Sequence, residues 1–269
     1  MEFLPLELDG KTGAEARRDG ARVAHLVGRL DEAESRGKHI WVGLEDHSLA
    51  PGEAPELYAD VYAEAGDPWV EQGHLTHIVL VADDEPILRV WFRLGFGQEQ
   101  VHAEAPTLAA AQPPPERVTI RQAGQADIEA VLDVAGIIST HQIGKPVWSG
   151  VRLRDREEIR ADWEEFLADE TSVILLAERE GTPIGYAATH PAEEPEVAHL
   201  PVAGTRPDVR GGGVGRALAE HLLHRAHEDG YRTVRADWRS TNLLASRFWP
   251  RLGFVPTHFR LRRDVQPTA

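Results

Sequence analysis

Six consecutive residues, Arg210 to Gly215, have the composition of an anion-binding loop (Arg-Gly-Gly-Gly-Val-Gly). A strand-like run, 198–205, precedes them, and a helix-like run, 216–223, follows. A glycine-rich turn that opens a helix presents bare backbone N–H groups at the positive end of the helix dipole, and it lets a phosphate reach the backbone. The run therefore predicts a phosphate site. The alternative, a flexible glycine turn, is not excluded by the loop alone.

A second motif follows one helix and one strand later, at Asn242 to Phe254. The paired order is Arg-x-x-Gly-x-Gly, then Asn-x-x-Ala-x-x-Phe-aromatic-x-x-Leu-Gly-Phe. This order resembles the GNAT family of acyl-CoA-dependent N-acetyltransferases. The resemblance implies the GNAT fold, acetyl-CoA as co-substrate and an amine as acceptor, but it implies no particular acceptor.

The resemblance also assigns coenzyme-binding residues. Backbone N–H groups of the loop would hold the pyrophosphate, the end of the preceding strand would pair with the pantetheine amides, and Asn242 would contact the pantetheine arm or cap a helix, roles that are compatible. Arg210 and Arg216 either add positive charge there or are ordinary exposed arginines. The complete set is Ala203, Gly204, Thr205, Arg210, Gly211, Gly212, Gly213, Val214, Gly215, Arg216 and Asn242.

A general base must take a proton from the incoming ammonium. The sequence offers Glu196, His199 and His190 on or near the strand that leads to the loop. The alternative for each of them is an ordinary solvent-facing side chain. Asp237 either holds a cationic acceptor or pairs with a neighbouring arginine.

Trp249 departs from the family pattern, in which many members have a tyrosine whose hydroxyl can protonate the leaving thiolate. An indole N–H is only a hydrogen-bond donor. Three alternatives stay open. Ser246 or a water substitutes, or no acid is needed, or the module binds coenzyme without transferring the acetyl group. Trp91 stands at the matching place in an earlier segment, which favours a structural role for Trp249.

That earlier segment is an internal repeat. Residues 89–96 and 247–254 agree at six of eight positions, at an offset of 158. A strand-like run and a helix-like run precede both segments. The repeat predicts an α+β protein with two tandem GNAT-like modules, each a mixed, mostly antiparallel sheet flanked by helices.

An Ala/Pro-rich stretch around 103–115 predicts the boundary, because three successive prolines favour an extended connector. We expect a degenerate module at 1–105, a linker at 106–116 and a coenzyme-binding module at 117–269. The first module has prolines and glutamates at 50–56 in place of a glycine loop. Prolines lack N–H donors and glutamates repel phosphate, so we expect no coenzyme there.

Composition narrows the function classes. The net charge of −15 is concentrated in residues 1–116, with 9 Lys and Arg against 22 Asp and Glu, which argues against nucleic-acid binding. There is no membrane-length apolar run and no secretory signal. The absence of cysteine and of HExxH spacing argues against a metal site. We expect a cytoplasmic protein, and a homodimer is left open.

The sequence therefore favours an N-acetyltransferase that moves an acetyl group from acetyl-CoA to an amine by direct attack in a ternary complex. The acceptor would be a small molecule or a peptide. The rival from another class is a non-catalytic acyl-CoA-binding or structural protein, which Trp249 favours. A further alternative is a factor that modifies aminoglycosides or peptides.

Overall fold

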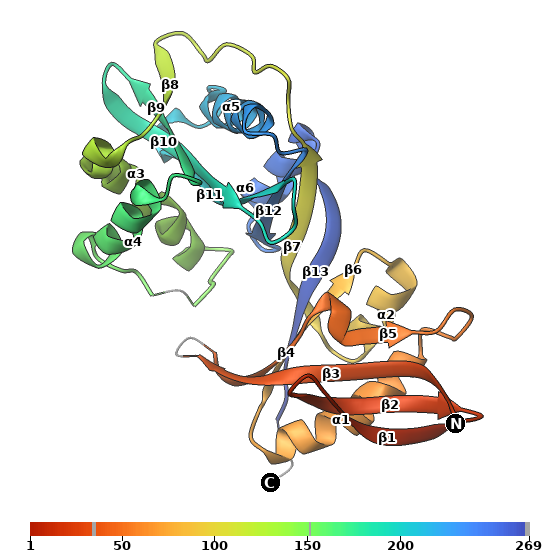
Figure 1. Ribbon diagram of the computed structural model, residues 1–269. Coiled ribbons are helices and arrows are strands. Elements are labelled where there is room, and N and C mark those ends of the chain that lie inside the picture. The colour runs from red at the N-terminus through yellow and green to blue at the C-terminus, as the bar shows by residue number, and fades with distance from the viewer. Residues whose placement is uncertain (34–35, 151, 267–269) are drawn as a thin grey trace. The chain divides into compact units, whose positions relative to one another are not determined.

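The chain forms two compact units (Figure 1). The computed structural model describes residues 1–33, 36–150 and 152–266. Unit 1 is Met1–Val101 with Pro256–Ala269, and unit 2 is His102–Val255. This division differs from the expected one at both ends. The last strand groups with unit 1, and residues 102–116 group with unit 2. The sequence shows where a strand lies but not which sheet receives it.

Unit 1 is a sheet in the order β1-β2-β3-β4-β6-β13. Neighbouring strands are antiparallel except β4 and β6, which are parallel, and β5 pairs with β3. Its elements are β1 (Glu2–Leu8), β2 (Lys11–Arg18), β3 (Ala21–Ala33), β4 (Gly37–Val42), β5 (His47–Leu49), α1 (Leu57–Glu71), β6 (Thr76–Ala82), α2 (Glu85–Arg93) and β13 (Val255–Asp264). A further strand, β7 (Gly97–Pro106), runs from unit 1 into unit 2.

The core of unit 1 lies between this sheet and α1. Alternate strand residues such as Ala24, Leu26 and Ile40 face the helix, as the two-residue period of a strand requires. Trp69 of α1 and Trp91 of α2 are almost fully buried in the same cluster. This unit therefore has an apolar core of its own.

Unit 2 is a sheet in the order β12-β11-β10-β9-β8. It is antiparallel except for the pair β11 and β12. Its elements are β8 (Val118–Gln122), α3 (Ile128–Ile143), α4 (Arg156–Ala168), β9 (Val173–Arg179), β10 (Thr182–Pro191), β11 (Val197–Thr205), α5 (Val214–Glu228), β12 (Thr233–Arg239) and α6 (Leu243–Phe248). A mixed, mostly antiparallel sheet flanked by helices is the architecture that the repeat predicted for the second module.

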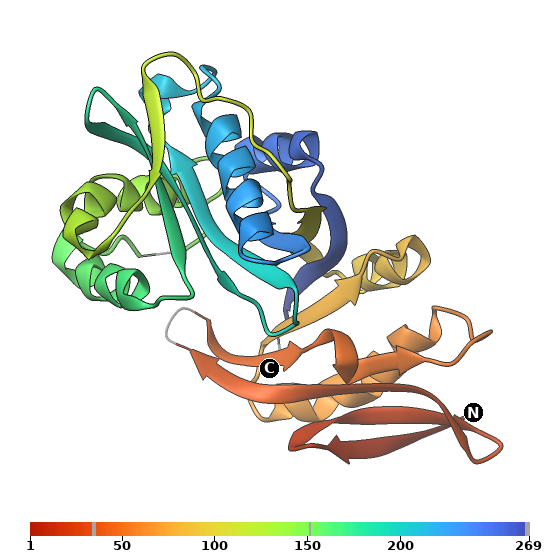
Figure 2. The same ribbon diagram turned by 45° about the horizontal axis from the view of Figure 1, so that its top comes forward.

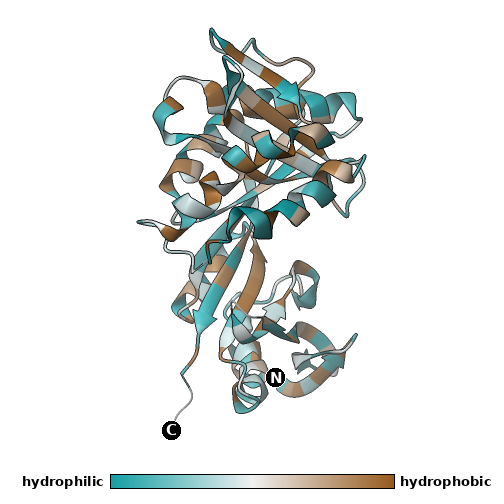
Figure 3. Cartoon of the chain, turned by 90° about the vertical axis from the view of Figure 1, so that its left-hand side faces the viewer, coloured by the Kyte–Doolittle hydropathy of each residue, from teal (hydrophilic) through white to brown (hydrophobic). Residues whose placement is uncertain are grey.

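Helices cover both faces of the unit 2 sheet (Figure 2). Tyr186 and Ala188 of β10 pack into the cluster that α3 and α4 complete. A Cβ added to Gly185 would lie on the other face of the sheet, 3.1 Å from Leu218 of α5. In Figure 3 the central strands of this unit are largely hydrophobic, whereas its helices alternate between hydrophobic and hydrophilic residues.

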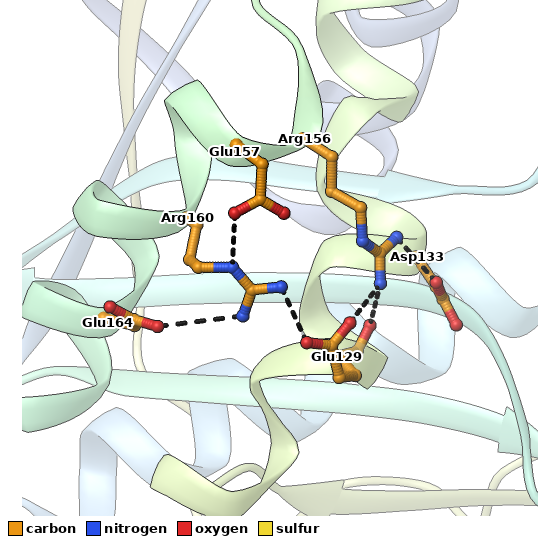
Figure 4. A network of polar contacts seen from close by, with 6 residues as sticks. All are labelled: Glu129, Asp133, Arg156, Glu157, Arg160 and Glu164. Atoms are coloured by element: carbon orange, nitrogen blue, oxygen red, sulfur yellow. Dashed lines mark hydrogen bonds and ion pairs between the residues drawn. The ribbon is translucent and has the colours of Figure 1, made fainter.

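Helix α4 is joined to α3 mainly at its surface, since none of its residues is fully buried. Glu129 of α3 accepts hydrogen bonds from Arg156 at 2.8 Å and from Arg160 at 2.7 Å, and Arg156 also reaches Asp133 (Figure 4). The apolar side chains Trp163, Phe166 and Leu167 complete the contact with the core. The two helices thus form one cover over that face of the sheet.

The internal repeat is visible as repeated structure. Asp84 and Asn242 each cap a helix by accepting from the backbone N–H three residues on, at 3.2 Å in both units. The ring centroids of Trp91 and Phe96 are 5.0 Å apart, as are those of Trp249 and Phe254. The units differ between their first two strands. β1 and β2 are joined by a tight turn, where unit 2 has α3 and α4.

Candidate functional site

A cavity of about 580 Å³ opens where α5 begins. Its walls come from α3, the end of β11, the glycine loop, α5 and α6. It is lined by Ile137, Ile138, His141, Tyr186, Ala203, Gly204, Thr205, Val209, Arg210, Gly211, Gly213, Val214, Gly215, Arg216, Leu218, Asn242, Leu244, Ala245, Arg247, Phe248, Trp249, Arg251 and Leu252. All the residues predicted to bind coenzyme line it except Gly212.

The glycine loop has the backbone geometry that its sequence requires. Gly211 and Gly213 both have φ of 82°, in the left-handed region that side-chain-bearing residues rarely adopt. Gly213 is the N-cap of α5, so the helix begins at Val214 directly after it. The first N–H groups of a helix have no partner within the helix. Here those groups lie at the cavity wall, where an anion would be bound by backbone and dipole together.

The strands β11 and β12 part beside the cavity. Their parallel pairing runs from Val197 with Thr233 to Leu200 with Ala236 and then ends. Beyond this point β11 remains paired with β10 as far as Thr205. The opposite edge of β11 at 203–205 therefore lies at the cavity, where its backbone can pair with an extended amide chain.

Helix α3 forms the wall opposite the loop. Gly204 permits its approach, because an added Cβ would meet Ile138 at 3.1 Å. His141, near the end of α3, reaches Asn242 with its Nε2 at 3.1 Å from Oδ1. The same oxygen accepts from Ala245 N–H, so the His141 nitrogen must donate. Sequence reasoning missed His141 because its partner lies about a hundred residues away.

Four arginines stand around the cavity: Arg210, Arg216, Arg247 and Arg251. Arg216 is paired with Glu220 one turn on in α5, at 2.7 Å. Within the described part of the chain, no carboxylate forms an ion pair with the other three arginines. A positive rim in a chain of net charge −15 favours an anionic ligand. Arg247 and Arg251 were not among the predicted residues, although both belong to the second motif.

Two aromatic side chains line the cavity without offering an acid. Trp249 is 7% exposed and packs edge-on against Phe248 and Phe254. Tyr186 donates its hydroxyl to the carbonyl of Ala135 at 3.0 Å, and burial raises the pKa of this phenol. Its hydroxyl proton is therefore committed to the Ala135 carbonyl and is hard to remove.

The predicted catalytic residues lie outside the cavity lining. The Ser246 hydroxyl lies 3.4 Å from the carbonyl of Ser240. Glu196 is in the turn before β11 and forms an ion pair with Arg232 at 3.1 Å. His199 is in β11 itself, between His190 of β10 and Asp237 of β12. The structure thus brings His190, His199 and Asp237 together and leaves Glu196 and Ser246 apart.

Unit 1 has a cavity of about 430 Å³ between the starts of α1 and α2. It is lined by Pro55, Glu56, Glu85, Pro86, Arg89, Val90 and Arg93. Its arginines are matched by carboxylates, Arg89 with Glu85 at 2.6 Å and Arg93 with Glu56 at 3.8 Å. The positive rim found in unit 2 has no counterpart in this set of residues.

Residues 137–254 match the model of the acetyltransferase (GNAT) family. They form a GNAT domain. Over 147 residues the chain is 31% identical to the mycothiol acetyltransferase of Streptomyces coelicolor, a match covering 54% of this chain and 44% of that protein. It is 36% identical over 93 residues to the protein of the same name from Cellulomonas flavigena, covering 31% and 27%. The chain thus spans less than half the length of these curated relatives.

Solved structures extend the likeness beyond the GNAT domain. A GCN5-related N-acetyltransferase from Sphaerobacter thermophilus is similar over 98% of this chain and 84% of its own, with a TM-score of 0.64 at 18% identity. A tandem GNAT protein from the clavulanic acid biosynthesis pathway covers 96% and 84%, with a TM-score of 0.56 at 15% identity. At identities this low, the structural likeness establishes the fold alone. It confirms the tandem GNAT architecture that the repeat predicted.

In segments 1–33, 36–150 and 152–266, none of the helices combines the length and apolar character needed to cross a membrane. In the same segments, no three His, Asp or Glu side chains are grouped so that they could hold a metal ion.

Proposed function

We propose that the protein is an N-acetyltransferase that transfers the acetyl group of acetyl-CoA to an amine. The observation that carries this proposal is the single cavity wall on which the glycine loop, the parted edge of β11 and Asn242 meet. The loop N–H groups and the side chains of Arg210, Arg247 and Arg251 would hold the phosphates. The edge of β11 and the side-chain NH2 group of Asn242 would hold the pantetheine arm. The reaction is then a direct attack within a ternary complex.

The protein would contribute mainly position and electrostatics. The amine adds to the thioester carbonyl, a C–N bond forms, the C–S bond breaks, and the coenzyme leaves as a thiolate. Backbone N–H groups near the parted strands would stabilise the oxyanion. Because neither Trp249 nor Tyr186 offers a proton, we propose that the thiolate departs without an acid from the protein. This departure is feasible because a thiolate is a tolerable leaving group near neutral pH.

The acceptor is proposed at the level of its class, an amine on a small molecule or a peptide. The curated relatives are named mycothiol acetyltransferases, so the unacetylated precursor of mycothiol is first among the amines to test. Amino sugars, aminoglycosides, polyamines and peptide N-termini complete the panel. We place the reaction in the cytoplasm, where acetyl-CoA is available.

Two measurements test this proposal. Calorimetric titration with acetyl-CoA should give a stoichiometry near one, because the arginines of the unit 1 cavity are already paired with glutamates. Thiol release from acetyl-CoA, followed with each amine and without amine, should rise with at least one acceptor. Binding near one site with no release for any amine would instead favour the non-catalytic acyl-CoA-binding alternative. A stoichiometry near two would show that unit 1 also binds coenzyme.

A further inference from the structure

Three titratable side chains form a line across neighbouring strands of unit 2. His190 of β10 lies directly opposite His199 of β11, and the two rings meet edge to face with His199 Nδ1 3.2 Å from His190 Nε2. On its other side, His199 Nε2 is 3.3 Å from Oδ1 of Asp237 in β12. The side chains of His199 and Asp237 are only 29% and 21% exposed. The contacts therefore join three strands through one central histidine.

The positions of the protons follow from the ends of this line. His190 Nδ1 is 2.8 Å from the carbonyl of Pro191, which can only accept, so this nitrogen carries a proton. If the His190 ring is neutral, its Nε2 then carries no proton and accepts a hydrogen bond from His199 Nδ1–H. The Asp237 carboxylate also accepts, so His199 Nε2 must donate as well. Every contact is then satisfied when the His199 ring carries both of its protons. The contacts are equally satisfied when the same proton sits on His190 Nε2, which then donates to His199 Nδ1 while His199 Nε2 donates to Asp237.

Removal of that proton leaves two acceptors facing each other at one of the two contacts, either His199 Nε2 and the Asp237 carboxylate or His199 Nδ1 and His190 Nε2. Its return restores both hydrogen bonds, so the three residues take up one proton as a unit. They do not form a metal site, because His199 directs opposite nitrogens at its two partners and the three side chains do not converge on one point.

This line lies at the inner end of the gap between β11 and β12. The last paired residues are Leu200 and Ala236, so Asp237 is the first residue of β12 beyond the pairing. An extra residue of β11 is accommodated between His199 and Val202, a bulge that redirects side chains as bulges beside active sites do. From Ala203 onward β11 lines the cavity. The His190 ring meets Phe166 of α4, which places the line on the face that α3 covers.

Two other charged side chains near the line, Arg235 and Asp169, already have partners of their own. Arg235, two residues before Asp237, is held by Glu104 at 2.7 Å and by Glu194 at 2.9 Å. Asp169, at the end of α4, lies near enough to His190 to interact with it electrostatically, and its carboxylate accepts from Thr171 and Ser172. The Asp237 carboxylate is therefore the member of the line that can attract a cationic amine.

We propose that His190, His199 and Asp237 act as one proton-accepting unit for the acceptor amine, an inference that rests on the acetyltransferase function proposed above. The acceptor ammonium gives one proton to the unit at its Asp237 end, where His199 Nε2 holds it. The neutral amine then attacks the thioester. The second proton lost from the nitrogen goes to the departing thiolate, which gives an amide and free coenzyme A. The proton on His199 is released to water before the next turnover.

Nuclear magnetic resonance of the histidine rings in the full-length protein tests the unit without any turnover. Long-range nitrogen–proton spectra, assigned with His190→Gln and His199→Gln and recorded over a range of pH, should show the two rings taking up one proton between them, with His190 Nδ1 protonated throughout. In Asp237→Asn, which removes the carboxylate that accepts from His199 Nε2, the two rings should release that proton more readily than in the parent. A titration of the two rings that does not respond to Asp237→Asn overturns the proposal, whether or not the protein transfers acetyl groups.

Kinetics test the catalytic role with the amine that gives thiol release. His199→Gln should lower kcat/KM by about 100-fold or more and remove the acidic limb of the pH profile, at an unchanged Kd for acetyl-CoA. Asp237→Asn should move that limb to lower pH. The control is His227→Gln, an exposed histidine at the end of α5. If Glu196→Gln removes the limb and His199→Gln leaves it in place, the base is Glu196 and the proposal is wrong.

Discussion

At the scale of residues, the proposed phosphate-binding site is made of backbone N–H groups. Placing a side chain in it is therefore the most direct way to perturb coenzyme binding. Gly215 is better suited than Gly213, whose φ of 82° would strain any other residue. A Cβ at Gly215 meets Phe248 at 3.6 Å and Thr205 at 3.7 Å, both ordinary contacts. Substitution at this position therefore changes the proposed site without forcing the backbone.

Gly215→Glu should weaken acetyl-CoA binding by at least ~2–3 kcal/mol, because it places a carboxylate at the proposed pyrophosphate site and removes a charge-assisted contact. Gly215→Ala is the matched control and should bind within about threefold of the parent, with slightly higher stability from better helix propensity. Calorimetric titration measures both. Parent-like binding by a folded Gly215→Glu protein would place the phosphates elsewhere.

Trp249 poses a question of mechanism at the same scale. It is buried against Phe248 and Phe254, and Trp91 repeats its packing in unit 1. If the position is structural, Trp249→Phe keeps coenzyme binding and most activity, and Trp249→Tyr does not raise turnover much. A missing general acid would instead be worth ~10²–10⁴-fold. Steady-state rates of the two variants distinguish a structural role from a missing general acid. A tenfold or larger gain in turnover with Trp249→Tyr, at unchanged coenzyme affinity, would contradict the structural role.

At the scale of elements, α4 is held to α3 by exposed ion pairs as well as by a few apolar contacts (Figure 4). Hydrogen bonds from Arg156 and Arg160 lower the pKa of Glu129. A carboxyl with a lowered pKa stabilises the folded state above its usual range, and this contribution disappears as the pH falls. Salt screens such exposed pairs. The packing of α4 against α3 should therefore loosen in acid and at high salt.

Glu129→Gln should speed hydrogen exchange of the α4 amides, 156–168, while exchange in β9 and β10 stays slow. The matched control is Glu165→Gln, an exposed carboxyl on the same helix whose side chain has no ion-pair partner among the described residues. Exchange at 1 M salt should reproduce the effect in the parent protein. Equal exchange rates of the α4 amides in the two variants would show that apolar packing alone holds α4 against α3.

At the scale of the whole molecule, the boundary read from the linker is not the boundary of the units. β13 pairs with β6 from His258 with Ala82 to Asp264 with Thr76. Residues 102–108 in turn contact unit 2, through Glu104 with Arg235 and through Thr107 and Leu108 with the backbone of Arg232 and Leu223. Each unit thus includes a segment that the linker boundary assigns to the other module.

A fragment of residues 117–269 should consequently be less soluble and less stable than one of residues 102–255. The first carries β13 without its partner β6, an unpaired strand of the kind that aggregates, and lacks the contacts of 102–108. Melting temperature and light scattering compare the two fragments. A well-behaved 117–269 fragment that melts like the full chain would mean that the modules are independent and joined only by a proline linker.

Unit 1 should also make the molecule sensitive to acid. Burial lowers the pKa of His77 to about 4, and its neutral ring donates to the carbonyl of His74 while accepting from Tyr62. Burial lowers the pKa of His25, His47 and His74 as well. Because a lowered histidine pKa disfavours protonation in the folded state, this stability is complete above pH ~6.5 and declines toward pH ~4.

His77 alone accounts for on the order of 3 kcal/mol of that decline in the free energy of unfolding. Urea denaturation between pH 7 and 4 measures it. His77→Phe keeps a ring in contact with Tyr62 and Trp69 and should flatten the pH dependence, although its stability at pH 7 is lower because the Tyr62 hydroxyl loses its acceptor. An unchanged slope in His77→Phe would assign the acid sensitivity to other groups.

Features that contiguous residues encode could be predicted from the sequence. The glycine loop, the caps at Asp84 and Asn242 and the repeated Trp–Phe pairs depend on spacings of a few residues, so local physics fixes them. The same motifs predicted the tandem GNAT fold and nearly all the residues that line the cavity on the side of the loop. They also predicted that Trp249 would be plain packing, which its burial supports.

Features that depend on strand register and on packing between distant segments could be seen only in the folded chain. The pairing of β13 with β6 joins residues about 180 positions apart, and His141 reaches Asn242 across 101 positions. His190, His199 and Asp237 share one face only because of the pairing of three strands and a bulge in β11. A shift of one residue in a strand would turn these side chains to the other face. Composition and local period do not carry that information.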